Sequence, residues 1–444
     1  MASLLLLGLV PVLFALGMSI GGKYAFHVSG TQDVKPRPWL VWLAMATMLV
    51  IRLLLAASME GYSCDVQTFQ AWAVRAAENL SGFYSGGFFA DYPPGYMYVL
   101  FLIGKLKELL DLPDGGSGFL ALIKLPAIIA DMLTTFLLYR LANLRFGKKA
   151  ALAVALMYGF NPAVILDSAV WGQVDAVFTL FIVLSIFFLT GNHLASSVSW
   201  FVVALLIKPQ ALIFTPLLLA SAVDRLLLQP VNGIWTRILV AAAAGGLVFM
   251  VGVAPFALEE GPLWVFDHYR ATLTSYPYAT VNAYNLFALS GANFTNETAS
   301  WLFFPYRSWG TLFIVLATLF AFRVYFCASE ETRLYLMGMF IIAAVFIFSA
   351  RMHERYLFPV LIFALLAALY AGSMQLLVIF TGFSITHYIN VVHVLIASTR
   401  GITHIPGNDP LLLGTSMANL LLFLYMLRCI ARSWSNQEGR LLPE

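Results

Sequence analysis

The sequence predicts an all-α protein, a polytopic bundle of transmembrane helices, and three observations support this fold class. Of its 444 residues, 61% are hydrophobic and only 11% are charged, whereas soluble domains carry about 25% charged residues. Apolar stretches recur along the chain, and most are long enough to cross a bilayer core of about 30 Å as helices. The net charge is only +3, so no strong basic field attracts nucleic acid. A soluble enzyme, a nucleic-acid-binding protein and a disordered scaffold are therefore excluded.

The apolar stretches predict about 11 to 13 membrane spans. The first has neither a basic region before it nor an A-x-A exit, so we expect a retained span rather than a cleaved signal peptide. Two stretches near residues 200 and 215 are short because the break at Lys208-Pro209 separates them. The expected spans are 4–20, 38–58, 119–141, 150–168, 174–190, 195–207, 209–223, 237–256, 308–326, 335–350, 356–372, 374–395 and 410–428.

Basic residues in the short connections predict the orientation, because Lys and Arg concentrate on the cytoplasmic side. One topology places nearly all of them on one side and most acids on the other, with the amino terminus outside. The basic residues are Lys23, Lys35, Arg37, Arg140, Arg145, Lys148, Lys149, Arg225, Arg237, Arg323, Arg333, Arg428, Arg432 and Arg440. The acids are Asp65, Glu78, Asp91, Glu108, Asp111, Asp114, Asp167, Asp175, Glu259, Glu260, Asp267, Glu354 and Asp409.

Two connections on the outer side are too long and too polar for simple turns, and loops of this length are usually functional. We treat 1–444 as one membrane domain with a first outer loop at 59–118 and a second at 257–307. The first carries apolar residues at helical spacing over Val66–Leu80, which predicts an amphipathic helix on the membrane surface. The second is rich in aromatic residues.

The first outer loop holds two candidate general bases. Asp65 lies a few residues past a span, and Asp91 begins the sequence Asp-Tyr-Pro-Pro. A carboxyl group near the membrane and among aromatic rings is partly desolvated, which raises its pKa toward the range that suits a base. The alternative is that both are ordinary solvated loop acids.

The run Asn161–Asp175 places Trp171, Gln173 and Asp175 in a short outer connection. An indole there is often an interface anchor. Amides and acids at this depth, by contrast, need partners.

The segment Arg351-Met-His353-Glu354-Arg355 combines two guanidiniums and an imidazole, which suits the binding of a phosphate. Snorkelling side chains at a helix end are the alternative interpretation.

Lys208, inside an apolar stretch, requires an anionic partner or a water-filled cavity. Asn285 can offer hydrogen bonds to sugar hydroxyls. His387 and His393 fit packing roles better than metal binding. The three cysteines form no CxxC pair, and we expect no metal site.

Taken together, these motifs resemble the GT-C integral-membrane glycosyltransferases, in particular the α-glucosyltransferases of the asparagine-linked pathway and bacterial relatives of the GPI-anchor mannosyltransferases. The resemblance covers about residues 58–372, in order. Its elements are Asp65 with Phe69 and Trp72, then Asp91-Tyr92-Pro93-Pro94, Asn161-Pro162 with Asp167 and Gln173, Lys208-Pro209-Gln210, Asn285-Leu-Phe, and His353-Glu354-Arg355. The sequence departs from the pattern at Arg355, where the family has Lys, and at Trp171-Gly-Gln-Val-Asp175.

The resemblance implies a GT-C fold and transfer of a hexose from a polyprenyl-phosphate carrier to a hydroxyl of a glycan or lipid-linked acceptor, outside the cytoplasm and without a metal cofactor. Asp65 and Asp91 are then the candidate catalytic residues. The residues expected to bind the donor phosphate are Lys208, Arg351, His353 and Arg355. Those expected to bind the sugar and acceptor are Trp171, Gln173, Asp175, Asn285 and Glu354. The expected partners are the donor, the acceptor and membrane lipids, without nucleic acid. A bacterial plasma membrane is the expected location, with the endoplasmic reticulum membrane as the alternative. The rival function is a transporter or flippase of lipid-linked sugars, which would also bury polar residues near the midplane.

Overall fold

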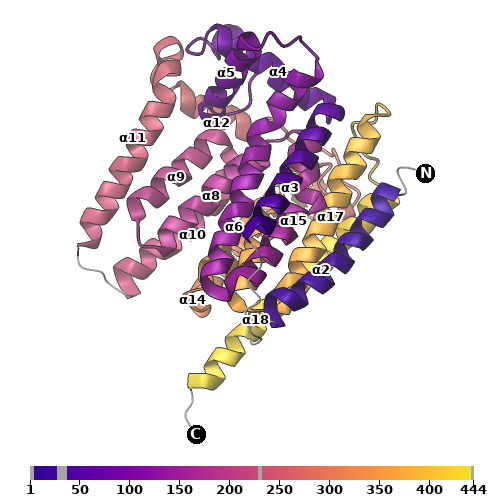
Figure 1. The fold of residues 1–444 in the computed structure, drawn as a ribbon. Coiled ribbons are helices and arrows are strands. Elements are labelled where there is room, and N and C mark those ends of the chain that lie inside the picture. Colours follow the sequence, from indigo (N-terminus) through magenta and orange to yellow (C-terminus); the bar gives the residue numbers. More distant parts are fainter. Residues whose placement is uncertain (1–4, 28–37, 229–232, 442–444) are drawn as a thin grey trace. The chain divides into compact units, whose positions relative to one another are not determined.

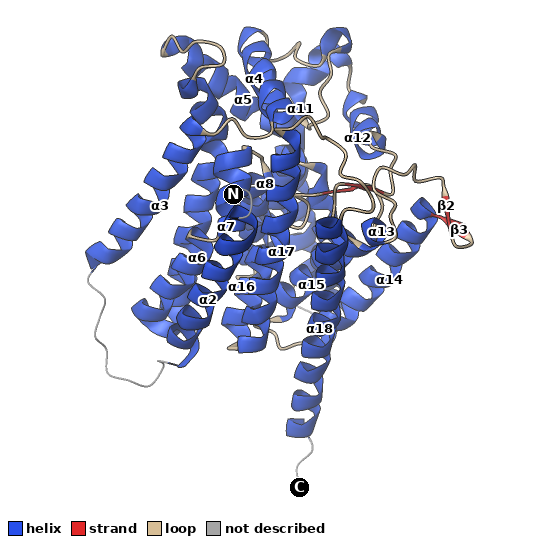
Figure 2. Ribbon diagram, turned by 90° about the vertical axis from the view of Figure 1, so that its right-hand side faces the viewer, coloured by secondary structure: helices blue, strands red, loops and turns tan. Residues whose placement is uncertain are grey.

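The computed structural model describes residues 5–27, 38–228 and 233–441, and its regular structure is almost entirely helical (Figure 1). In these residues the strands are limited to four segments of two residues each, drawn in red in Figure 2. The all-α prediction is therefore confirmed. Of the basic residues used to predict the orientation, Lys35 and Arg37 lie outside the described residues, as do the side chains of Lys23 and Arg440.

The chain folds into two compact units, which we describe separately. The first unit comprises Met1–Leu49, Met132–Asp167 and Pro277–Glu444, and the second comprises Val50–Asp131 and Ser168–Tyr276. Two helices, α3 (Pro38–Ser58) and α6 (Ser117–Gly159), contribute residues to both units. Our description of 1–444 as one membrane domain stays a prediction.

The helices of the second unit begin with those of the first outer loop. In chain order they are α4 (Ser63–Glu78), the 3-10 turn η2 (Ser85–Gly87), α5 (Pro94–Leu109), most of the π-helix η3 (Leu166–Trp171), α8 (Asp175–Thr190), α9 (Leu194–Ile207), η4 (Pro209–Phe214), α10 (Thr215–Val223), η5 (Asp224–Leu228), α11 (Ile234–Glu260) and α12 (Trp264–Thr274).

The first unit holds the amino-terminal and carboxy-terminal helices and all four strands. Its elements are η1 (Leu5–Leu9), α2 (Val10–His27), α7 (Pro162–Ile165), β1 (Thr280–Val281), α13 (Leu286–Leu289), β2 (Ser300–Trp301), β3 (Phe304–Pro305), α14 (Tyr306–Cys327), α15 (Arg333–Phe348), β4 (Met352–His353), α16 (Pro359–Ala371), α17 (Met374–Ser398) and α18 (Pro410–Leu441).

Seven helices of the described residues are long and apolar enough to cross a membrane: Trp39–Ser58, Ser117–Gly159, Pro209–Leu228, Ile234–Glu260, Tyr306–Cys327, Met374–Ser398 and Pro410–Arg432. Six shorter apolar helices accompany them. Together they match most of the expected spans. The predicted span 150–168 is wrong as one continuous helix, because α6 ends at Gly159 and a new helix starts at Pro162. Asn161 caps that start, accepting a hydrogen bond from the Ala163 amide at 3.0 Å.

The amphipathic helix predicted in the first outer loop is confirmed as α4, which buries one face: Val66, Phe69, Trp72, Ala73, Ala76 and Ala77. That face lies against α5, a helix not predicted within this loop, and not on the membrane surface as expected. Pro94 opens α5, where the missing amide hydrogen costs nothing. At Gly104 a Cβ atom would collide with the backbone carbonyl of Ala73. A glycine at this position therefore lets the two helices pack closely.

Candidate active site

The carboxylate of Asp65 is held by two side chains from the connection between η3 and α8. Asp65 lies in the first turn of α4. Its Oδ2 atom accepts a hydrogen bond from the Trp171 indole Nε1 at 2.7 Å and another from Gln173 Nε2 at 2.5 Å. Tyr62, which precedes α4, stacks on the Trp171 ring with centroids 4.8 Å apart and an interplanar angle of 7°. The carboxylate therefore has a fixed orientation.

A glycine makes this arrangement possible. Gly172 separates the two donors and has φ +88°, a left-handed conformation that other residues adopt at a cost. A Cβ atom there would lie 3.0 Å from the side chain of Lys124. The turn at Gly172 ends the π-helix at Trp171 and lets both Trp171 and Gln173 reach Asp65.

The Asp-Tyr-Pro-Pro motif joins the same group of residues. The Tyr92 hydroxyl donates to Gln173 Oε1 at 3.0 Å, so one amide side chain connects Tyr92 with Asp65. The carbonyl of Tyr92 accepts from the Tyr84 hydroxyl at 2.7 Å and lies 3.0 Å from His268 Nε2 of α12. We call Asp65, Asp91, Tyr92, Trp171 and Gln173 the Asp65 cluster.

Burial and neighbouring charges both act on the carboxyl group of Asp91, the second candidate base of the cluster. Burial raises its pKa, and the negative charge of Asp65 raises it further. A backbone hydrogen bond at Asp91, the positive charge of Lys208 and a long hydrogen bond from the Tyr276 hydroxyl, at 3.5 Å, act in the opposite direction. Partial desolvation and the negative charges of Asp65 and Asp91 also raise the pKa of the neighbouring, largely exposed Cys64 thiol. These charges therefore lie within electrostatic range of one another.

Lys208 has the anionic partner that its apolar surroundings require. Its Nζ atom lies 2.7 Å from Asp175 Oδ1, and the two side chains are only 2% and 1% exposed. The same ammonium lies 5.9 Å from the ring centroid of Tyr92 and 5.7 Å from that of Phe178, where aromatic faces stabilise a cation. Asp175, predicted to bind sugar or acceptor, is thus placed as the counter-ion of a buried lysine.

In the first unit, Arg351 forms an ion pair with an acid of the second outer loop. The Arg351 side chain donates from Nε to Glu297 Oε2 at 2.6 Å and from its terminal nitrogen to Glu297 Oε1. These hydrogen bonds raise the pKa of Arg351. The backbone of Arg351 has φ +63°, and the next two residues form β4, which pairs in parallel with β1. The pair therefore fastens the outer loop to the Arg351–Arg355 segment.

Glu354 and Arg355 of this segment are buried, and His353 is half-buried. Arg355 donates to Glu354, and their side chains are 10% and 5% exposed. The ring of His353 lies 5.0 Å from that of Tyr356. Their predicted roles toward the donor phosphate and the sugar remain predictions, and they belong to a different unit from the Asp65 cluster.

The side chain of Asn285 caps helix α13 and forms hydrogen bonds through both its oxygen and its nitrogen. Its Oδ1 accepts from the amides of Phe287 and Ala288, and its Nδ2 donates to the Phe346 carbonyl at 3.2 Å. The side chain is 0% exposed. This placement favours a structural role over the sugar contact expected from the sequence. Conversely, no sequence motif indicated a role for Tyr84, His268 or Tyr276. The tertiary structure brings His268 of α12 and the nearby Tyr276 to the Asp-Tyr-Pro-Pro segment, where Tyr84 of the same outer loop also contacts it.

Comparison with known families supports the resemblance drawn from the motifs. Residues 93–258 match the model of the family described as dolichyl-phosphate-mannose-protein mannosyltransferase. The matched stretch is shorter than half of the chain. It contains Trp171, Gln173, Asp175 and Lys208 and begins two residues after Asp91. No curated protein matches the chain. The family match and the apolar helices support a multi-pass membrane glycosyltransferase of the GT-C superfamily that uses a polyprenyl-phosphate sugar.

Proposed function

We propose that this protein transfers a hexose from a polyprenyl-phosphate carrier to a hydroxyl of a glycan or lipid-linked acceptor on the extracytoplasmic face, without a metal cofactor. The observation that carries the proposal is the Asp65 carboxylate, oriented by Trp171 and Gln173 and placed within electrostatic range of Asp91. Lys208 adds a positive charge near the same residues. One unit thus combines an oriented base with a cation.

The reaction needs a base for the acceptor and stabilisation for the leaving group. As the acceptor oxygen attacks the anomeric carbon, the bond from that carbon to the phosphate oxygen breaks with inversion. Asp65 takes the hydroxyl proton, and the bonding electrons leave with the polyprenyl phosphate. General-base catalysis of this kind contributes about 10²–10⁴-fold. We assign to Lys208 the positive charge that offsets the negative charge building up on the phosphate. Arg351, His353 and Arg355 remain separate candidates for phosphate binding.

The transporter alternative depends mainly on two charged residues in apolar stretches, Asp131 and Lys208. Both have specific partners in the second unit. Arg52 Nε donates to Asp131 Oδ2 at 3.2 Å, and the side chains of that pair are completely buried. Ser168 also donates to the same oxygen of Asp131. Fixed, dehydrated pairs of this kind fit structural roles as well as they fit transport, so the oriented carboxylate favours the transferase.

Transfer of radiolabelled hexose from a synthetic polyprenyl-phosphate hexose by the purified protein tests this function. Asp65→Asn keeps the volume of the side chain but removes the base, so we expect turnover to fall by about 10²-fold or more while donor binding changes little. Asp114→Asn is the matched control, because Asp114 belongs to the same outer loop and is 84% exposed. Normal turnover by Asp65→Asn would exclude Asp65 as the base. Movement of the labelled lipid across proteoliposomes without sugar transfer would instead support a transporter.

Cys64 provides an independent test of the membrane face on which the Asp65 cluster lies and of whether the sugar donor binds there. It is exposed and precedes Asp65 in the chain. A membrane-impermeant maleimide should label it in intact cells, and a polyprenyl-phosphate sugar should slow this labelling. Cys64→Ser is the control that identifies the labelled residue. Labelling only after permeabilisation would place the Asp65 cluster on the cytoplasmic side and refute the proposed topology.

A further inference from the structure

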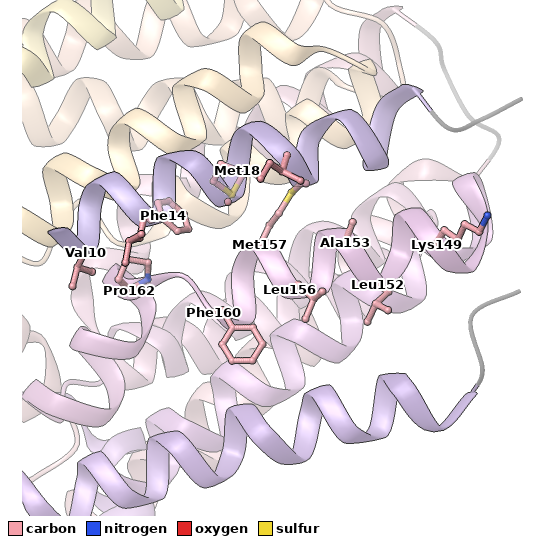
Figure 3. A pocket seen from close by; sticks show the side chains of 14 residues that line it. Val10, Phe14, Met18, Lys149, Leu152, Ala153, Leu156, Met157, Phe160 and Pro162 are labelled. Carbon is pink, nitrogen blue, oxygen red and sulfur yellow. The ribbon is translucent and has the colours of Figure 1, made fainter. Parts of the chain in front are cut away.

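An apolar groove runs along α2 in the first unit, whereas the Asp65 cluster belongs to the second unit. Its walls are α2 and the last part of α6, with Pro162 at one end (Figure 3). The cavity measures about 900 Å³. Its lining is apolar except for one amine: Val10, Leu13, Phe14, Gly17, Met18, Ile20, Gly21, Lys149, Leu152, Ala153, Leu156, Met157, Phe160 and Pro162. The volume and lining suit a hydrocarbon chain.

Charge distinguishes the two ends of the groove. Lys149 is the one charged side chain among the described residues that line it, and Figure 3 shows its amine at the end opposite Val10 and Pro162. The helix breaks at Gly147, whose φ and ψ are 79° and 174°, so Lys149 lies at the start of a separate helical segment. Arg145, just before this break, forms an ion pair with Glu331. The basic end lies on the side that the sequence predicts to be cytoplasmic.

The length of the groove fits one leaflet. From Lys149 to the end of α6 at Gly159 the helix rises about 15 Å, at about 1.5 Å per residue. That is about half of the 30 Å hydrocarbon core of a bilayer, the depth that one acyl chain occupies below its headgroup. We propose that the groove binds an anionic phospholipid of the cytoplasmic leaflet, with one acyl chain between α2 and α6 and its phosphate at Lys149.

Charge, more than chain burial, should set the selectivity of this site. The acyl chain leaves an equally apolar bilayer, so its burial in the groove gains little from the hydrophobic effect. A basic residue near the membrane surface attracts an anionic lipid with a strength that corresponds to about fivefold in affinity. We therefore expect phosphatidylglycerol to bind about fivefold more tightly than phosphatidylcholine with the same acyl chains.

Native mass spectrometry of the full-length protein, titrated with each of these two lipids, measures this preference. Lys149→Ala should remove the preference for phosphatidylglycerol. Lys148→Ala is the matched control, since it removes the same charge from the adjacent residue, which is exposed and does not line the groove. Equal losses in the two variants would indicate attraction by general surface charge and would overturn the site.

A second pair of variants tests the groove itself. A side chain at Gly17 would enter open space in the groove, because a Cβ atom there meets nothing within 4 Å. Gly17→Phe should therefore abolish tight binding of phosphatidylglycerol and of phosphatidylcholine. Gly8→Phe is the control, since Gly8 is equally open but does not line the groove. Thermal unfolding of each variant identifies any that misfolds, and Ala153→Phe then replaces Gly17→Phe.

Two results would refute the proposal. The first is unchanged lipid binding by the folded variant that fills the groove. The second is displacement of bound phosphatidylglycerol from the wild-type protein by an equimolar polyprenyl phosphate, which would make the sugar carrier the occupant. Retention of one phosphatidylglycerol in the presence of that carrier supports the phospholipid.

Discussion

Replacing Lys208 with methionine is expected to destabilise the second unit strongly. Lys208 and Asp175 form an ion pair at 2.7 Å in which both side chains are almost completely buried. Methionine keeps an unbranched chain of similar volume but removes the charge. The carboxylate of Asp175 is then left in an interior that solvates it poorly.

The expected magnitude follows from that burial. Removing one partner of a buried ion pair costs about 3–5 kcal/mol, mainly because an uncompensated charge stays behind. Replacing both partners with apolar residues is often neutral or stabilising. The double variant Lys208→Met/Asp175→Leu should therefore lie much closer to wild type than either single variant does.

The assay is thermal unfolding of the four proteins of this double-mutant cycle, each purified in the same detergent. An exposed ion pair is the control: Lys105 and Glu108 lie 2.8 Å apart with side chains 47% and 51% exposed. Lys105→Met should cost no more than about 1 kcal/mol. Sugar transfer by the folded double variant then distinguishes a role of Lys208 in stability from a role in the reaction. Loss of transfer in a stable protein would indicate that the reaction needs the charge of Lys208.

Two results would refute this reasoning. If Lys208→Met is as stable as wild type, then the buried side chain of Asp175 does not depend on Lys208 for its stability. If the effects of the two single changes simply add in the double variant, then the two side chains do not depend on each other for stability.

Two further predictions follow from the residues around the sites. Asp91 has a raised pKa in the folded protein, so its contribution to stability is present below the unfolded pKa and is lost as the pH rises through the folded pKa. Asp91→Asn should therefore raise the melting temperature relative to wild type at about pH 7, and the gain should shrink toward about pH 4; a constant difference would contradict this. Arg355→Ala should weaken binding of a polyprenyl-phosphate sugar by about 1.5–3 kcal/mol if Arg355 contacts the phosphate. Arg355→Lys, which can still pair with Glu354, should lose less, and unchanged affinity in a folded Arg355→Ala protein would remove this residue from the donor site.

The sequence by itself determined the fold class and most helices, because hydropathy and periodicity are local properties of the chain. The amphipathic pattern of α4 was readable from Phe69, Trp72, Ala73 and Ala76, which share one face at helical spacing. The sequence also showed that Lys208 needs a counter-charge, since the cost of an unpaired charge in an apolar stretch does not depend on the fold. It missed α5 and α12, because both lie within connections that composition alone assigned to loops.

Only the tertiary structure decided which polar groups meet. Trp171 and Gln173 reach Asp65 across more than a hundred residues, Asp175 pairs with Lys208, and Glu297 pairs with Arg351. Asn285, which composition made a candidate for binding sugar, caps a short helix instead. The physical reason is the same in each case. A polar residue's type fixes how many hydrogen bonds or counter-charges it requires, but the packing of helices that are distant in sequence fixes which neighbour provides them.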